Sequence, residues 1–75
     1  MPKLKIVGWK TGLKKISMTQ ILRIEIFTNL VEAKMCTDAV LAGKKFEFNI
    51  EDEEKLKRTA KDLEEIGAII EVELT

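Results

Sequence analysis

Few side chains in this sequence of 75 residues are suited to acid–base or metal chemistry. Histidine, the commonest general base near neutral pH and the commonest metal ligand, is missing. The single cysteine, Cys36, has no imidazole to activate it, and its place within a predicted helix favours a buried, inert thiol. Residues 51–54 are all acidic, but successive positions at a helix start point in different directions. A solvated first turn is therefore a better interpretation than a metal site.

No other stretch has the spacing of a catalytic or nucleotide-binding motif. Residues 8–12 contain a Lys-Thr pair between glycines, but they lack the Walker spacing and the helix that should follow it directly. We expect a protein that is not an enzyme, with no catalytic residue, no metal and no cofactor. A small enzyme or metal protein is the competing hypothesis, and stoichiometric metal in the purified protein would favour it.

The charges are divided unevenly along the chain. Its 13 Lys and Arg residues balance 13 Asp and Glu residues, yet residues 1–23 carry +6 and the remainder carries −6. Such an asymmetry is typical of chains that meet a charged partner. A basic patch holding Lys14, Lys15 and Arg23 would steer an acidic protein surface toward the first helix. The alternative is that these cations only solubilise a helix whose other face is buried.

Nucleic acid is not an expected partner. Its recognition uses basic residues interleaved with aromatic ones, whereas this chain has no tyrosine, three phenylalanines in core patterns and no net charge. The only tryptophan, Trp9, lies between two glycines in a predicted loop. Two roles stay open for it: an anchor for a partner, or a ring folded back over the sheet edge.

Length and composition indicate one globular domain over residues 1–75. Hydrophobic residues make up 45% of the chain and charged residues 35%. No apolar run approaches the roughly 20 residues of a membrane span, so we expect neither a membrane segment nor a signal peptide. One cysteine suits a reducing compartment, which predicts a cytoplasmic protein.

Periodicity predicts the first half of the domain. Residues 4–7 form a strand, and a helix begins near Lys15 with Met18, Ile21, Leu22 and Ile26 as its apolar stripe. Asn29 is the expected N-cap of a second helix, with Glu32 at capping-box spacing and Gly43 just beyond its end. Its inward-facing candidates are Leu30, Ala33, Ala39, Val40 and Leu41.

The second half repeats a strand, a helix and a strand. Residues 45–50 alternate strictly, which is the clearest strand signal in the chain. A third helix follows the acids, with an apolar stripe ending at Ile66 and Gly67 as its stop. Its acids and bases are spaced for i,i+4 ion pairs: Glu51–Lys55, Glu53–Lys57 and Glu54–Arg58. Residues 68–74 form the last strand, with Ala68, Ile70, Val72 and Leu74 facing inward.

This order of elements, β-α-α-β-α-β, predicts the topology. Two helices return the chain beside the first strand, so the second strand runs antiparallel to it, and the third helix crosses over to a third strand. The expected fold is a two-layer α+β sandwich: a three-stranded antiparallel sheet of order 2-1-3 with three helices on one face.

Four stretches carry a resemblance to a known family. They are Leu4-Lys5-Ile6-Val7 with the following Gly12 and Lys14-Lys15-Ile16, the ungapped helix from Lys15 to Arg23, Leu30-Val31-Glu32-Ala33-Lys34, and Leu63-Glu64-Glu65-Ile66-Gly67-Ala68 with Glu71-Val72-Glu73. In order and spacing they resemble the C-terminal domain of the bacterial large-subunit ribosomal stalk protein. The resemblance covers nearly all of residues 4–74, and it implies a ribosomal-type protein–protein interaction module that acts in translation.

The resemblance also implies where a partner binds, because the family's first helix contacts translational GTPases. Lys15, Ile16 and Arg23 keep the family's character, whereas Thr19 replaces an aliphatic residue and Gln20 a lysine. We therefore expect weak or absent binding to such GTPases, and expect the solvent-facing changes Thr19→Ile and Gln20→Lys to strengthen it without altering the fold. The predicted partner-binding residues are Lys14, Lys15, Ile16, Thr19, Gln20, Arg23, Asn29 and Lys34.

Two alternatives remain beside this module. A related fold belongs to the adaptor that delivers N-degron substrates to the Clp protease, but this chain lacks that family's histidine and acidic opening motif. The adaptor hypothesis therefore survives only as a general one, a domain that docks a peptide or an AAA+ partner. The other alternative is a small regulatory homodimer built on a sheet edge, so we expect a monomer or a weak homodimer.

Overall fold

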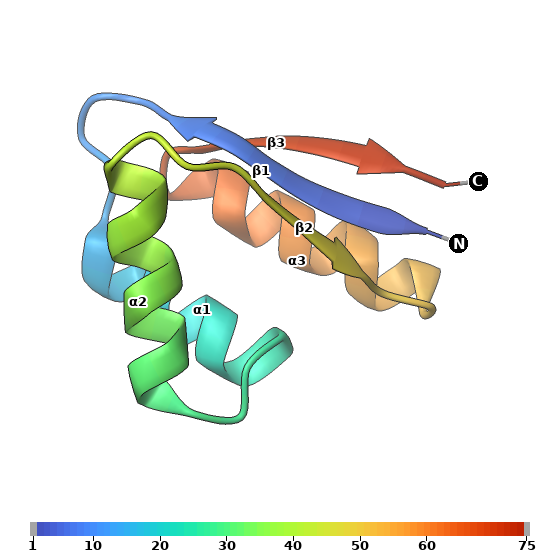
Figure 1. Ribbon diagram of the computed structural model, residues 1–75. Helices are drawn as coiled ribbons and strands as arrows, with labels where there is room; N and C mark the ends of the chain where they lie inside the picture. Colours follow the sequence, from blue (N-terminus) through green and yellow to red (C-terminus); the bar gives the residue numbers. More distant parts are fainter. Residues whose placement is uncertain (1, 75) are drawn as a thin grey trace.

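The computed structural model describes residues 2–74, and its element order and topology confirm the predicted fold. The elements are β1 (Lys3–Trp9), α1 (Lys15–Glu25), α2 (Leu30–Leu41), β2 (Phe46–Asn49), α3 (Glu53–Glu65) and β3 (Ala68–Glu73). The strands form one antiparallel sheet in the order β2-β1-β3, and all three helices lie on the same side of it (Figure 1). The molecule is therefore a two-layer α+β sandwich with one sheet face uncovered.

The core lies between the sheet and the helix layer. Strand β1 contributes Leu4 and Ile6, which are fully buried and face Phe48 and Phe46 across the β1–β2 ladder. Ile50 after β2 and Ala68 of β3 are also buried, and the helices supply the rest of the buried hydrophobic set: Met18, Leu22, Ala33, Cys36, Val40, Leu56, Ala60 and Leu63. These positions recur every three or four residues along each helix, so the predicted stripes of α1 and α3 are the faces that the fold buries.

Strand β1 is longer than the sequence indicated, and this corrects the loop predicted at residues 8–12. Gly8 and Trp9 belong to the strand and lie opposite Ile69 and Ala68. The register shifts between Ile6 and Gly8, so Val7 is the extra residue of a bulge. The bulge places Trp9 on the same face as Ala68, the helix side, where its ring stays 41% exposed at the sheet end.

The predicted N-cap of α2 and the predicted glycines after α2 and α3 are confirmed, and the structure adds Asp52 as the N-cap of α3. The Asn29 side chain accepts a hydrogen bond from the Val31 N–H at 2.7 Å, and Asp52 accepts from two N–H groups at the start of α3 at 3.0 and 3.2 Å. Gly43 and Gly67 follow their helices with φ of 98° and 108°, the left-handed conformation that other residues rarely adopt. The caps therefore fix where two of the three helices begin and end.

One predicted inward residue, Leu30, is wrong, and the end of β3 is less buried than its inward facing suggests. Leu30 is 56% exposed, because it is the first residue of α2 and lies at the end of the helix farthest from the sheet. Val72 lies opposite buried Leu4 and therefore faces the helix side as predicted. It is nevertheless 42% exposed, and Leu74 is 45% exposed, because β3 is an edge strand covered by α3 alone.

The predicted i,i+4 ion pairs of α3 are not formed among the described residues. Arg58 instead reaches the last turn of α1, where its Nη2 lies 3.1 Å from Glu25 Oε2. The same carboxylate oxygen accepts a hydrogen bond from the Thr59 hydroxyl at 3.2 Å. Glu25 of α1 thus accepts from two residues of α3. This tertiary contact replaces the predicted pair Glu54–Arg58, which would have contributed about 0.2–0.5 kcal/mol.

The uncovered face of the sheet is charged rather than apolar. Lys5 Nζ lies 3.1 Å from Glu73 Oε2 and 3.7 Å from Glu47 Oε1, so one cation on the central strand joins both edge strands. The hydrogen bond to Glu73 raises the pKa of Lys5, and the same bond lowers the pKa of Glu73.

Candidate functional site: the groove between helices α1 and α2

A groove of about 490 Å³ lies between α1 and α2, and we call it the α1–α2 groove. It is lined by Lys15, Ile16, Thr19, Gln20, Leu30, Lys34, Thr37 and Asp38. The two helices pack against each other on the helix side of the sheet, where α2 runs toward the sheet and α1 lies across behind it (Figure 1). The groove therefore lies on the helix side, away from the charged sheet face.

Two threonine hydroxyls join the helices at this groove. Thr37 is buried, and its hydroxyl donates to the Ala33 carbonyl at 3.1 Å. The Thr19 hydroxyl lies 3.0 Å from Thr37 Oγ1 and 3.0 Å from the Lys15 carbonyl, so its single proton has two acceptors within reach. The hydroxyl of Thr37 is thus satisfied within the fold, and the contact fixes the spacing of the two helices.

Two large apolar side chains stand open at the groove. Ile16 on α1 is 78% exposed and Leu30 on α2 is 56% exposed. Exposed apolar side chains are ordinary when they are scattered singly, but these two line the same groove from opposite helices. The groove therefore offers apolar area that only a bound partner would remove from water.

Cations surround this apolar area. Lys15 and Lys34 line the groove, with Asp38 as its one acid. Helix α1 has no acidic residue in its first turn, and its N-cap residue, Lys14, makes no side-chain capping bond. Positive charge at a helix N-terminus is unfavourable because it opposes the macrodipole. The stability of α1 therefore does not explain why Lys14 and Lys15 stand at its start.

Five of the eight predicted partner-binding residues line the groove, and three lie outside it. The five are Lys15, Ile16, Thr19, Gln20 and Lys34. Lys14 is the exposed N-cap of α1, Arg23 is exposed in the last turn of α1, and Asn29 uses its side chain to cap α2. The structure thus gathers most of the predicted set but gives Asn29 a structural role.

The expectation that Thr19 faces solvent is wrong. Its side chain is half-buried, and its hydroxyl lies against Thr37, whereas Gln20 is exposed as expected. The physical reason is helical geometry: Thr19 follows buried Met18 on the side of α1 that α2 approaches. A substitution at position 19 therefore alters the contact between the helices as well as the groove surface.

The sequence interpretation missed three groove residues: Leu30, Thr37 and Asp38. One signal for the first of them was present. Apolar residues lie all around α2 rather than on one face, and a helix of that kind buries its second face against something else. Val31 and Met35 are further apolar residues of α2 that remain exposed.

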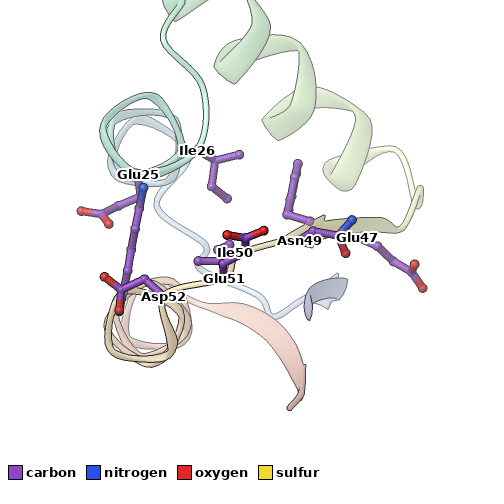
Figure 2. A pocket seen from close by; sticks show the side chains of 9 residues that line it. Glu25, Ile26, Glu47, Asn49, Ile50, Glu51 and Asp52 are labelled. Carbon is purple, nitrogen blue, oxygen red and sulfur yellow. The ribbon is translucent and has the colours of Figure 1, made fainter. Parts of the chain in front are cut away.

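A second hollow, of about 510 Å³, lies where the end of α1 meets β2 and the start of α3 (Figure 2). Its lining includes Ile26 and Ile50 together with the carboxylates of Glu25, Glu51 and Asp52. Two of these carboxylates are already engaged, because Glu25 accepts from Arg58 and Thr59, and Asp52 caps α3. Within residues 2–74, no three acidic or cysteine side chains are placed to hold a metal ion.

The Cys36 thiol is enclosed in the core beneath α2. Burial raises its pKa to about 11, so the thiol is protonated at neutral pH. The thiolate is the nucleophilic form, and this side chain therefore has neither the charge state nor the access that covalent chemistry requires.

Comparison of the chain with protein-family models, with curated proteins and with solved structures found no match. The resemblance to the ribosomal stalk domain accordingly stands as a hypothesis carried by its own residues. Over residues 2–74, no helix is both long enough and apolar enough to cross a membrane.

Proposed function

We propose that this protein is a non-catalytic protein–protein interaction module, and that its α1–α2 groove binds an amphipathic helix of a partner protein. The observation that carries the proposal is the pairing of open apolar side chains with cations in one groove: Ile16 and Leu30 beside Lys15 and Lys34. Apolar grooves between two helices commonly bind the apolar face of an amphipathic helix from a partner.

The charges define the partner further. Lys15 and Lys34 line the groove, while Lys14 and Arg23 stand exposed at the two ends of α1. Acidic residues flanking the apolar stripe of a partner helix would meet these cations. Such complementarity raises the association rate and selects against basic partners more than it adds affinity. The proposed occupant is therefore an acidic amphipathic helix.

The resemblance to the stalk domain agrees with this proposal and suggests a class of partner, a translational GTPase. Gln20 supplies no positive charge where that family has lysine, and Thr19 is partly taken up by its contact with Thr37. We therefore keep the expectation that such GTPases bind this chain weakly or not at all. The proposed site of action is the reducing cytoplasm, which suits a single buried thiol.

A charge-reversal series tests the proposal. The probe is a synthetic, fluorescently labelled peptide of about five helical turns with a leucine stripe flanked by glutamates. We expect it to bind the wild-type protein, and we expect Lys15→Glu/Lys34→Glu to weaken binding by about tenfold or more, because each removed cation also becomes a repulsive charge. The matched control is Lys57→Glu/Lys61→Glu, which makes the same charge change on exposed α3.

The outcomes separate groove binding from general attraction. Equal weakening by both double variants would show that net charge alone attracts the peptide and would contradict a site at the groove. No binding by the wild-type protein to the acidic peptide, at salt from about 0.01 to 0.15 M, would contradict the proposed partner chemistry. Circular dichroism of each variant confirms that the fold is retained.

A further inference from the structure

Strand β2 lies at one edge of the sheet and pairs only with β1. The N–H of Ile50 donates to the Pro2 carbonyl at 3.2 Å, which identifies these two residues as a hydrogen-bonded pair of the ladder. Such pairs alternate along antiparallel strands, so Leu4–Phe48 and Ile6–Phe46 are the next two.

This alternation fixes which backbone groups of β2 are free. The N–H and C=O groups of Phe46 and Phe48 point toward β1, so those of Glu47 and Asn49 point out of the sheet. An edge of this kind is a template for another strand.

A mainly apolar hollow lies beside the same edge, between α2 and β2. It holds about 440 Å³, and its lining includes Phe27, Met35, Ala39 and Phe46, with Glu32, Lys44 and Lys45 as its charged residues. Phe46 is on the helix side of the sheet, since it faces buried Ile6. A strand added next to β2 would therefore place alternate side chains over this hollow.

We infer that the occupant of this edge is a second copy of the chain, paired antiparallel through β2 about a two-fold axis at Phe46. In that register Lys45 of each copy, the residue directly before β2, would lie opposite Glu47 of the other, whose backbone groups point outward as such a pair requires. The interface would be isologous, with two attractive cross-strand pairs. The two Phe46 rings meet on the helix side, at the apolar hollow.

Charge argues against two alternatives. A two-fold axis at Glu47 would bring two carboxylates together, which is destabilising. The opposite edge, β3, carries only acidic charges on its open face, Glu71 and Glu73, and offers no attractive pair to a second copy. The dimer edge is separate from the α1–α2 groove, and the two inferences share no residue.

A charge swap tests the register. Sedimentation velocity over a range of protein concentration measures the dimer dissociation constant of the wild type and of Lys45→Glu and Glu47→Lys. We expect each single variant to raise that constant by about tenfold, since two attractive pairs become repulsive. A mixture of the two variants is expected to form heterodimers with wild-type affinity, because both cross-strand pairs between positions 45 and 47 then join a carboxylate to an ammonium group again. Recovery in the mixture also shows that both variants fold.

Three results would overturn the inference. A wild-type protein that stays monomeric at the highest soluble concentration has no such dimer. A dimer that neither single variant weakens uses another surface. A dimer that both variants weaken but their mixture does not restore is paired in another register. The control Glu71→Lys, on the opposite edge, is expected to leave the dissociation constant unchanged.

Discussion

Burial of the Cys36 thiol has a direct chemical consequence. Because its pKa is raised to about 11, only about a thousandth of the thiol is ionised at pH 8, against roughly a tenth or more of an ordinary cysteine. We expect iodoacetamide to alkylate the native protein about 100-fold more slowly than the unfolded one. Mass spectrometry of quenched samples measures both rates. Equal rates in buffer and in denaturant would contradict the buried position of this thiol.

The ion pair between Lys5 and Glu73 predicts a pH dependence of stability. The lowered pKa of Glu73 contributes stability that is present above its usual value of 4.5 and is lost as pH falls through the lowered pKa. The raised pKa of Lys5 contributes stability that is present below 10.5 and is lost as pH rises through the raised pKa. Between these limits, Glu73→Gln is expected to lower the free energy of unfolding slightly, because the pair is exposed.

Denaturant unfolding at pH 7 and pH 2 checks this expectation. The difference between wild type and Glu73→Gln should be present at pH 7 and should shrink as pH falls through the lowered pKa of Glu73, because the carboxylate then takes up a proton. A difference of the same size at both pH values would show that Glu73 acts through packing instead. Glu64→Gln, an exposed change on α3, is the matched control.

Lys14 is the N-cap residue of α1, and a lysine at this position does not stabilise the helix. Its backbone has the extended N-cap conformation, with φ of −86° and ψ of 96°, but its side chain caps nothing. We expect Lys14→Asp to raise the free energy of unfolding by about 1 kcal/mol and the melting temperature by roughly 4–8 °C. The same change should weaken binding of the acidic helical peptide, since it removes a cation next to the groove.

Lys10→Asp gives the comparison for that prediction. It makes the same charge change at an exposed loop residue, without a helix N-terminus beside it. Calorimetry should show stabilisation by Lys14→Asp and little change for Lys10→Asp. If Lys14→Asp destabilised the protein, the lysine would have a structural role that its open position does not indicate.

At the scale of the elements, the contact between α1 and α2 depends on Thr19. Replacing its hydroxyl by a methyl group in Thr19→Val removes the hydrogen bonds to Thr37 and to the Lys15 carbonyl. We expect a loss of about 1 kcal/mol, because the Thr37 hydroxyl keeps its bond to Ala33. Urea unfolding measures this loss, and Thr28→Val in the exposed turn should change stability little. An unchanged midpoint for Thr19→Val would contradict a structural role for this contact.

The same contact changes how the family-restoring substitutions must be tested. Thr19→Ile exchanges a hydrogen-bonding side chain for a larger apolar one in a half-buried place, so it confounds affinity with stability. Gln20→Lys alone adds a cation at an exposed residue of the groove. It is therefore the cleaner probe of binding to a translational GTPase.

Sequence signals that depend only on neighbouring residues predicted the helices and strands well. The cap at Asn29, the glycines after α2 and α3, and the strict alternation of residues 45–50 each depend on neighbouring residues, and the fold uses all of them. The β1 bulge at Val7 was not predictable in this way, because it depends on the register with β3. The i,i+4 charge spacing also predicted the wrong partner for Arg58, which pairs with Glu25 of α1 instead of Glu54.

The candidate site was predictable mainly on α1, and on α2 only at Lys34. The basic, acid-free stretch indicated α1, and five of the predicted residues do meet at the groove. Thr37 and Asp38 could not be placed there from sequence, since the approach of α2 decides which of its side chains reach the groove. The exposure of Leu30 likewise follows from its place at the far end of α2.

At the scale of the whole molecule, two surfaces with different partners lie on different parts of one small sandwich. The α1–α2 groove is proposed for an acidic helix, and the free edge of β2 for a second copy. On the open face of the sheet between the two edges, Lys5 forms ion pairs with Glu47 and Glu73. A dimer formed through β2 would present two grooves, so a partner with two acidic helices would gain avidity without any new contact.

The most direct test of the central claim is a nuclear magnetic resonance titration of the isotope-labelled protein with the acidic amphipathic peptide. The account predicts that the largest amide shifts fall at Ile16, Gln20 and Lys34, that they saturate, and that salt weakens the binding. A peptide with lysine in place of glutamate should leave these amides unmoved. Shifts of equal size with both peptides, or largest shifts on α3 or the open sheet face, would contradict the proposed interaction module.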